Sequence, residues 1–227
     1  MVRDLRVLIR MTHHHLSLLD SEGLPDYLST VNIPGDDSLM HLNDQNKRAL
    51  LHLARESILS AVHHQQLTPT KHESTVLQEP AGAFVTLRSH SELRGCIGYI
   101  EPKLPLVRTV EEVAAKAALE DPRFHPLSDD ELDQVDIEIS VLSPLQKVNK
   151  VEDIEVGRHG LVVDAGFTRG LLLPQVAEEN HWDRETFIRH TAVKAGLAPE
   201  AWNHPSVQLF SFTVDKFSES ELTPKHH

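Results

Sequence analysis

Apolar and polar residues alternate strictly between Val135 and Val141, and this pattern constrains the fold more than any other part of the sequence. The apolar residues are Val135, Ile137, Ile139 and Val141, and the polar residues between them are Asp136, Glu138 and Ser140. Successive side chains of a β-strand point to opposite faces, so the segment predicts a strand with one face in a core. The other face is expected to point toward solvent or a cleft.

Helix and strand patterns surround this segment without a regular alternation of strand and helix. We expect, in chain order, a helix from Asn43 to about Gln66, a hairpin of 83–87 with 93–100, a helix from Pro105 to Asp121, the strand 135–141, a hairpin of 161–163 with 171–173, a short helix from Pro174, a helix from Asp183 to Gly196 and a last strand 207–217. This order fits an antiparallel or mixed sheet flanked by helices better than a doubly wound parallel sheet. The predicted fold class is therefore α+β.

Charge and cysteine content exclude several classes of protein. The chain has 22 Lys+Arg against 34 Asp+Glu, a net charge of -12, which repels nucleic-acid phosphates, so we expect no nucleic-acid partner. No segment approaches the roughly 18 consecutive apolar residues of a membrane span, so no membrane association is expected. The single cysteine, Cys96, allows no intramolecular disulfide and indicates a reducing compartment, so we expect a cytoplasmic protein.

Neither a metal nor a cofactor is expected. The sequence contains 16 histidines, but none of them stands in the fixed spacing that a structural metal site requires. Signatures of phosphate loops, dinucleotide sites, zinc proteases, CxxC sites and GxSxG hydrolases are all absent from the sequence.

The most unusual local feature is the segment 93–98, in which Gly95 and Gly98 bracket Cys96. Glycine inside a strand marks a bulge or a close approach to the backbone, so both glycines are candidate ligand-binding residues. Arg94 shares a strand face with Cys96 and could lower the pKa of its thiol, which favours the reactive thiolate. Cys96 is therefore a candidate catalytic nucleophile. The alternative is a buried structural cysteine, which behaves as a small apolar residue.

A nucleophilic cysteine needs a base, and His125 is the preferred candidate. Three arginines, Arg94, Arg123 and Arg169, each lie beside a turn or a glycine and could together bind a carboxylate or phosphate. A small anionic ligand is the partner that this arrangement indicates. The alternative is that each arginine pairs with a core carboxylate such as Glu138.

Several further segments accompany 93–98, and together they resemble the AMMECR-one family. These segments are Leu93-Arg94-Gly95-Cys96-Ile97-Gly98, Asp121-Pro122-Arg123-Phe124, Ile139-Ser140-Val141-Leu142-Ser143-Pro144, Gly157-Arg158-His159-Gly160-Leu161, Arg169-Gly170 with Leu173-Pro174-Gln175-Val176, and Lys194-Ala195-Gly196-Leu197 with Ala201-Trp202. The resemblance covers residues 43–217. It leaves 1–42 as an N-terminal extension and 218–227 as a C-terminal tail.

The resemblance implies an α+β domain with an antiparallel sheet, surrounding helices, a smaller subdomain and a cleft near Cys96. Similar proteins are known as protein A of the AmmeMemoRadiSam system, which also contains a Memo-like protein and a radical SAM protein. The resemblance therefore implies these two proteins as partners. The residues, together with what the resemblance implies, leave two hypotheses open. One is an enzyme or enzyme component that acts through Cys96, and the other is a non-catalytic protein that docks a Memo-like subunit.

Overall fold

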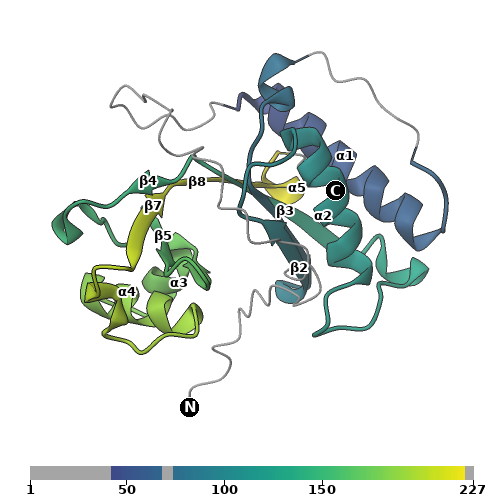
Figure 1. Ribbon diagram of the computed structural model, residues 1–227. Coiled ribbons are helices and arrows are strands. Elements are labelled where there is room, and N and C mark those ends of the chain that lie inside the picture. Colours follow the sequence, from purple (N-terminus) through teal and green to yellow (C-terminus); the bar gives the residue numbers. More distant parts are fainter. Residues whose placement is uncertain (1–41, 68–73, 223–227) are drawn as a thin grey trace. The chain divides into compact units, whose positions relative to one another are not determined.

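The computed structural model describes residues 42–67 and 74–222, and Figure 1 shows their arrangement. The helices are α1 (Asp44–Val62), α2 (Leu106–Leu119), α3 (Pro174–Glu179), α4 (Arg184–Lys194) and α5 (Glu219–Leu222), and the strands are β1 (Ala83–Ser89), β2 (Glu92–Tyr99), β3 (Val135–Leu142), β4 (Gln146–Lys147), β5 (Gly160–Asp164), β6 (Arg169–Leu172), β7 (Gln208–Phe212) and β8 (Val214–Ser218). The eight strands form two antiparallel four-stranded sheets. The predicted α+β class is confirmed.

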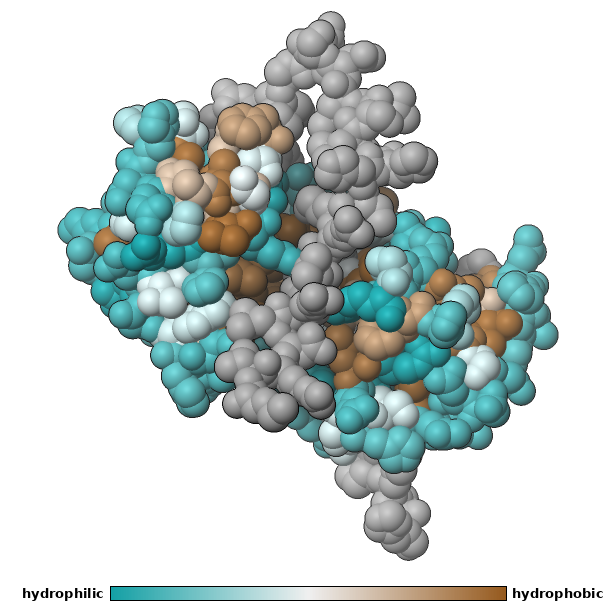
Figure 2. All heavy atoms as spheres, turned by 90° about the horizontal axis from the view of Figure 1, so that it is seen from below, coloured by the Kyte–Doolittle hydropathy of each residue, from teal (hydrophilic) through white to brown (hydrophobic). Residues whose placement is uncertain are grey.

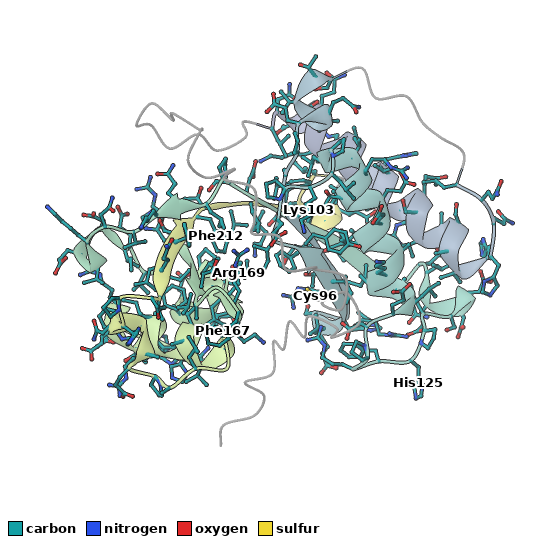
Figure 3. The ribbon with its side chains drawn as sticks, in the orientation of Figure 1. Cys96, Lys103, His125, Phe167, Arg169 and Phe212 are labelled. Carbon is teal, nitrogen blue, oxygen red and sulfur yellow. The ribbon has the colours of Figure 1, made fainter. Side chains whose placement is uncertain are left out.

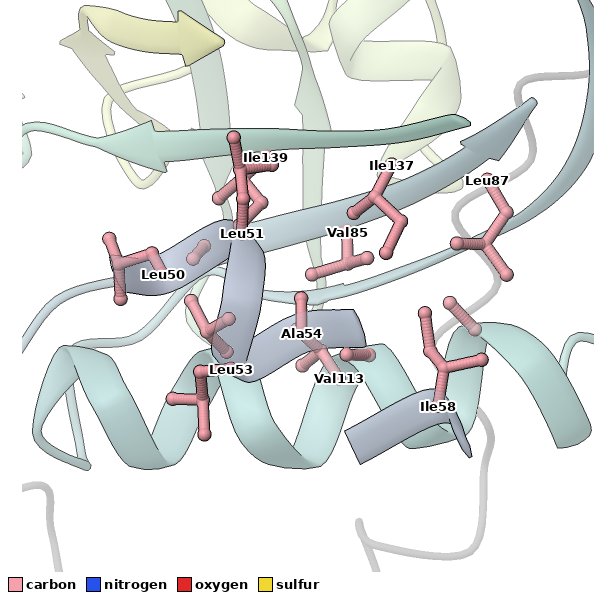
Figure 4. Packing of buried hydrophobic residues seen from close by; sticks show 14 of the residues in the cluster. Leu50, Leu51, Leu53, Ala54, Ile58, Val85, Leu87, Val113, Ile137 and Ile139 are labelled. Atoms are coloured by element: carbon pink, nitrogen blue, oxygen red, sulfur yellow. The ribbon is translucent and has the colours of Figure 1, made fainter. Parts of the chain in front are cut away.

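The first sheet has the strand order β2-β1-β3-β8 and carries the main core on one face. Every second residue of β3 is part of that core, as the alternation in the sequence predicts. Figure 4 shows how side chains of α1, α2 and this sheet meet. Apolar positions such as Leu50, Ala54 and Ile58 repeat at intervals of four, which places them on one side of α1 and buries them against the sheet. The opposite face of the sheet carries Thr86 and Glu138.

The second sheet has the order β4-β7-β5-β6, and α3 and α4 belong to this part of the chain. It corresponds to the smaller subdomain that the family resemblance implies. The predicted hairpin around Gly166 is confirmed as β5 and β6. The two-residue strand β4 is too short to leave a periodic pattern and was not predicted.

The prediction of one continuous strand over 207–217 was wrong. The chain leaves the second sheet after β7 and enters the first sheet as β8, with Thr213 between them. The N–H of Thr213 donates to Ser143 Oγ at 2.9 Å, and the N–H of Ser143 donates to the Thr213 carbonyl at 3.0 Å. The two segments that cross between the sheets therefore satisfy each other's backbone groups, and the break in the strand costs no hydrogen bond.

The ends of the long helices follow local rules. Asn43 Oδ1 accepts from the Asn46 N–H at 2.9 Å at the start of α1, and Asp183 Oδ1 accepts from the Thr186 N–H at 2.8 Å at the start of α4. These are the two residues from which the sequence predicts the helices to begin. Pro105 immediately precedes the first residue of α2, where its missing N–H costs nothing.

The last helix, α5, is anchored to the main core, although the sequence carried no signal for it. Its first residue, Glu219, forms an ion pair with Arg55 of α1 and accepts from the Ile137 N–H at 3.2 Å. Arg55 also donates to the carbonyls of Leu132 and Val135. Of the predicted extension 1–42, residues 1–41 lie outside the described residues, as do 223–227 of the predicted tail.

No helix within 42–67 and 74–222 is both long enough and apolar enough to cross a lipid bilayer. The face in Figure 2 is a mixture of hydrophilic residues and separate hydrophobic patches.

Candidate functional site

Cys96 lies on β2, which is an edge strand of the first sheet. It pairs with Thr86 of β1, and Thr86 pairs in turn with Glu138 of β3, so the three side chains share the face opposite the main core. Thr86 Oγ1 donates to Cys96 Sγ at 3.2 Å. The cysteine is partly exposed.

The loop after α2 covers the open edge of β2 at Cys96. Asp121 Oδ2 accepts from the Cys96 N–H at 2.8 Å, and Arg123 Nη2 donates to the Cys96 carbonyl at 3.4 Å. The Arg123 guanidinium also donates to both Asp121 oxygens, at 2.9 Å from Nε and 2.6 Å from Nη2. Side chains thus take the place of a neighbouring strand, and the edge is closed to pairing with another chain at this point.

The Asp121 carboxylate is the centre of this arrangement. Its side chain is 3% exposed, and burial alone would raise its pKa. Hydrogen bonds from the Arg123 side chain, the Cys96 N–H and the Arg123 N–H outweigh the burial, so the pKa of Asp121 is lowered. The carboxylate is therefore ionised at neutral pH and pairs with a charged guanidinium.

The pKa of the Cys96 thiol is shifted in the opposite direction, upward. Burial raises the pKa of Cys96, and the nearby carboxylates Asp121 and Glu138 act in the same direction. The hydrogen bond from Thr86 and the charge of Arg123 lower the pKa, but they do not compensate for the burial. Cys96 is therefore a neutral thiol at pH 7, whereas a nucleophile needs the thiolate.

His125 lies on the same loop but not against the thiol. Its side chain is exposed, and Figure 3 shows it apart from Cys96. The Cys96 thiol accepts a hydrogen bond from Thr86 Oγ1 on the neighbouring strand instead. His125 is not in position to act as the base for Cys96 in this arrangement.

The raised pKa gives a direct prediction for thiol chemistry. At pH 7, Cys96 of the folded protein should react with iodoacetamide more slowly than Cys96 of the protein unfolded in urea. The labelling rate should rise with pH to a midpoint above the free-thiol value of about 8.5. Mass spectrometry of the labelled protein over pH 6–10 measures both quantities. Fast labelling with a midpoint below pH 7 would contradict the prediction and would support a preformed thiolate.

The two glycines around Cys96 are explained by packing. A Cβ on Gly95 would lie 2.2 Å from the Ala117 carbonyl oxygen of α2. A Cβ on Gly98 would lie 2.0 Å from a ring carbon of Phe84, on the neighbouring strand. The close approach that glycine indicates is thus made by a helix and an aromatic ring of the chain itself. Binding of a ligand by Gly95 and Gly98 stays a prediction.

Each of the three candidate arginines has a carboxylate partner, and none of these partners is Glu138. Arg94 pairs with Glu131, Arg123 with Asp121, and Arg169 with Asp164 and Glu101. The Glu138 carboxylate lies instead 3.4 Å from Lys216 and 3.9 Å from Arg88. Asp136, two residues earlier on the same face, accepts hydrogen bonds from the N–H and the hydroxyl of Ser220.

Arg94 and Arg123 come together, whereas Arg169 lies on the second sheet. The guanidinium carbons of Arg94 and Arg123 lie 5.9 Å and 5.4 Å from the centroid of the Phe124 ring. These three residues, with Pro122 and His125, line an open pocket of about 450 Å³. Six of the seven predicted site residues are thus found on β2 or on the loop that caps it: Arg94, Gly95, Cys96, Gly98, Arg123 and His125.

Glu131 holds Arg94 in place without using all of the N–H groups of the Arg94 guanidinium. Its Nε and Nη2 donate to the two oxygens of Glu131 at 2.7 and 2.9 Å. Hydrogen bonds from Arg94, followed by those from Ser128, lower the pKa of Glu131 to about 2, so the pair is fully ionised at neutral pH. No hydrogen bond joins Arg94 Nη1 to the described residues, and this group remains available to a ligand in the pocket.

The sequence did not single out Asp121, Thr86 or Glu131 as parts of the site. Asp121 belongs to a segment that carried the family resemblance, and its place directly before Pro122 and Arg123 was the available signal. Thr86 could be located only once the pairing of β1 with β2 was known. Within 42–67 and 74–222, no three His, Cys, Asp or Glu side chains are grouped as a metal site would need.

Comparisons with known proteins agree with the fold and with the resemblance expected from the sequence. The model of the AMMECR1 family matches residues 51–217. Protein MK0488 of Methanopyrus kandleri is 42% identical over 181 residues, which cover 76% of this chain and 87% of that protein. Protein TK0174 of Thermococcus kodakarensis is 39% identical over 192 residues, covering 80% and 94%. The crystal structure of the uncharacterized protein PH0010 from Pyrococcus horikoshii matches with a TM-score of 0.73 and 37% identity, covering 79% of this chain and 94% of that one.

Proposed function

The chain belongs to the AMMECR1 family, and on this premise we propose that it is an enzyme or enzyme component that binds a small anionic ligand beside Cys96. One observation carries the proposal. Two guanidinium groups flank the Phe124 ring and line an open pocket next to the strand that holds the thiol. Paired guanidinium groups suit carboxylates and phosphates because their planar N–H groups match those oxygens.

The pocket is organised before any ligand arrives. Glu131 holds Arg94 through two hydrogen bonds, and Asp121 holds Arg123 in the same way. Immobilised side chains lose little conformational entropy on binding, which favours affinity. Arg123 also donates to the Cys96 carbonyl, so the pocket and the thiol share a fixed frame.

Cys96 and His125 take separate roles in this proposal. Cys96 is a neutral thiol at rest and offers a hydrogen bond or a proton to the ligand, because a bound anion disfavours the thiolate. His125 lines the pocket directly, so it serves as an acid or base toward the ligand and not toward the thiol. A Memo-like protein and a radical SAM protein are the partners that supply or consume the ligand.

Replacement of Arg94 with glutamine tests the proposal. Inorganic phosphate and succinate are titrated into the full chain by calorimetry, and we expect Arg94→Gln to weaken binding roughly tenfold, since a charge-assisted hydrogen bond contributes about 1.5–3 kcal/mol. Arg108→Gln is the matched control, because Arg108 lies exposed on α2 and pairs with its neighbour Glu111. Equal affinities of the wild type and Arg94→Gln for both anions would refute the site.

One observation favours the alternative, a non-catalytic protein that docks a Memo-like subunit. Phe167, at the tip of the β5–β6 hairpin, is 84% exposed, and exposed aromatic side chains often anchor protein interfaces. Pull-down with a purified Memo-like protein separates the two functions. Under the docking function, Phe167→Ser abolishes the complex while Cys96→Ser leaves both the complex and the cellular phenotype intact.

A further inference from the structure

The charges around the pocket beside Cys96 are balanced. Arg94 pairs with Glu131 and Arg123 pairs with Asp121, with closest N–O distances of 2.7 and 2.6 Å. Both carboxyl groups are ionised at neutral pH, because the pKa of each is lowered. The two arginines and the two carboxylates therefore sum to zero charge. A ligand with several negative charges finds no excess of positive charge in these two pairs.

Arg94 keeps one nitrogen for a ligand. Its Nε and Nη2 donate to the two oxygens of Glu131. Nη1 carries two further N–H groups, and neither of them donates to a residue in the part of the chain that the structure describes. Arg123, in contrast, already donates to Asp121 and to the Cys96 carbonyl. Arg94 Nη1 therefore suits a single anionic group.

The pocket is much larger than an inorganic ion. Its volume is about 450 Å³, which falls in the range of about 300–1,000 Å³ that is typical of sites for small organic molecules. One water molecule occupies about 30 Å³ in the liquid, so a single phosphate ion fills only a small part of this volume. A ligand that fills the pocket therefore has an organic body in addition to its charged group.

Two of the five lining residues, Pro122 and Phe124, supply apolar surface for that body. Pro122 is exposed and Phe124 is partly exposed, so a ligand that covers them removes apolar surface from water. Such burial contributes about 25 cal/mol per Å². A ligand with an apolar body gains this contribution, whereas inorganic phosphate does not.

We infer that the ligand of this pocket is an organic monocarboxylate with an apolar, ring-sized body. The inference rests on the proposed function and specifies its ligand. Arg94 Nη1 binds the carboxylate, and the body lies against Phe124 and Pro122. The balanced charges of the two arginine–carboxylate pairs and the net charge of -12 both act against a second negative charge, so phosphates and dicarboxylates are poorer ligands.

The test uses the full chain and calorimetry at constant ionic strength and at pH 8, where histidine side chains carry little charge. Phenylacetate should bind roughly tenfold more tightly than acetate, the gain expected when about 60 Å² of apolar surface is covered. Phenyl phosphate has the same ring but about two negative charges at this pH, and it should bind more weakly than phenylacetate. Phenylacetamide, which lacks the charge, should also bind more weakly.

Phe124→Ala should remove the preference for phenylacetate and leave the weak binding of acetate unchanged. Phe167→Ala is the matched control, because Phe167 is 84% exposed on the β5–β6 hairpin and does not line the pocket. This variant loses the same ring and should bind phenylacetate as the wild type does.

The comparison of ligands on the wild type does not depend on a variant that folds. If phosphate, phenyl phosphate or succinate binds as tightly as phenylacetate and Arg94→Gln weakens that binding, the inference fails and the proposed function stands. Full preference for phenylacetate in Phe124→Ala has the same meaning. If phenylacetamide binds as tightly as phenylacetate, or if the wild type binds none of these anions, the inference and the proposed function both fail.

Discussion

Replacing Asp121 with alanine is expected to lower the free energy of unfolding by about 3–5 kcal/mol, the usual cost of removing one partner from a buried ion pair. The Asp121 carboxylate accepts from the Cys96 N–H and from the Arg123 guanidinium and N–H. Its loss leaves a guanidinium that is 22% exposed without its counter-charge and a strand N–H without its acceptor. Urea denaturation at pH 7 measures the change.

Asp129→Ala is the matched control for this experiment. Asp129 is 79% exposed and forms a single ion pair with His63, so its loss should cost no more than about 1 kcal/mol. Asp121→Asn should fall between the two, since it retains an acceptor oxygen but not the charge. A cost below about 1 kcal/mol for Asp121→Ala would mean that the Cys96 edge is held by something other than this carboxylate.

The parts of the fold that were predicted from the sequence are those that local chemistry determines. The alternation from Val135 to Val141 depends only on the two-residue repeat of a strand, and β3 has it. The caps Asn43 and Asp183 act on backbone groups three residues away. Such signals are complete within a few residues, so no knowledge of the tertiary structure is needed to interpret them.

The features that were missed depend on contacts between distant residues. The division of 207–217 at Thr213 follows from a hydrogen-bond exchange with Ser143, 70 positions earlier. Nothing in the residues around Thr213 differs from the interior of a continuous strand. In the same way, the structural role of Glu219 depends on its contacts with Arg55 and Ile137, which lie far from it in the sequence.

The candidate site shows the same limit. The sequence identified Arg94 and Arg123 as potential anion ligands, and the fold places both beside the Phe124 ring. It could not identify their carboxylates, because Glu131 lies 37 positions from Arg94 and no local pattern links them. Nor could it separate Arg169 from the other two, since that distinction depends on which sheet each strand joins.

Replacing Gly95 with alanine is expected to lower the free energy of unfolding by about 3 kcal/mol. This is the upper end of the usual cost of placing extra atoms in a packed core. The new Cβ would lie 2.2 Å from the Ala117 carbonyl oxygen and 3.3 Å from its carbon. Both are backbone atoms of α2, so no side chain can rotate to relieve the contact. Either β2 or α2 has to move, and both are packed on the main core.

Gly166→Ala separates this steric effect from the general cost of replacing glycine. Gly166 has a φ of +82°, and a Cβ added there would meet no described atom within 4 Å, so alanine should cost only the backbone strain, about 1–2 kcal/mol. Thermal and urea denaturation of the two variants give the comparison. If Gly95 instead served to admit a ligand, Gly95→Ala would leave stability unchanged and weaken the binding of phosphate or succinate. A large loss of stability would mean that the glycine before Cys96 is required by α2, and that ligand recognition beside the thiol depends on the arginine side chains.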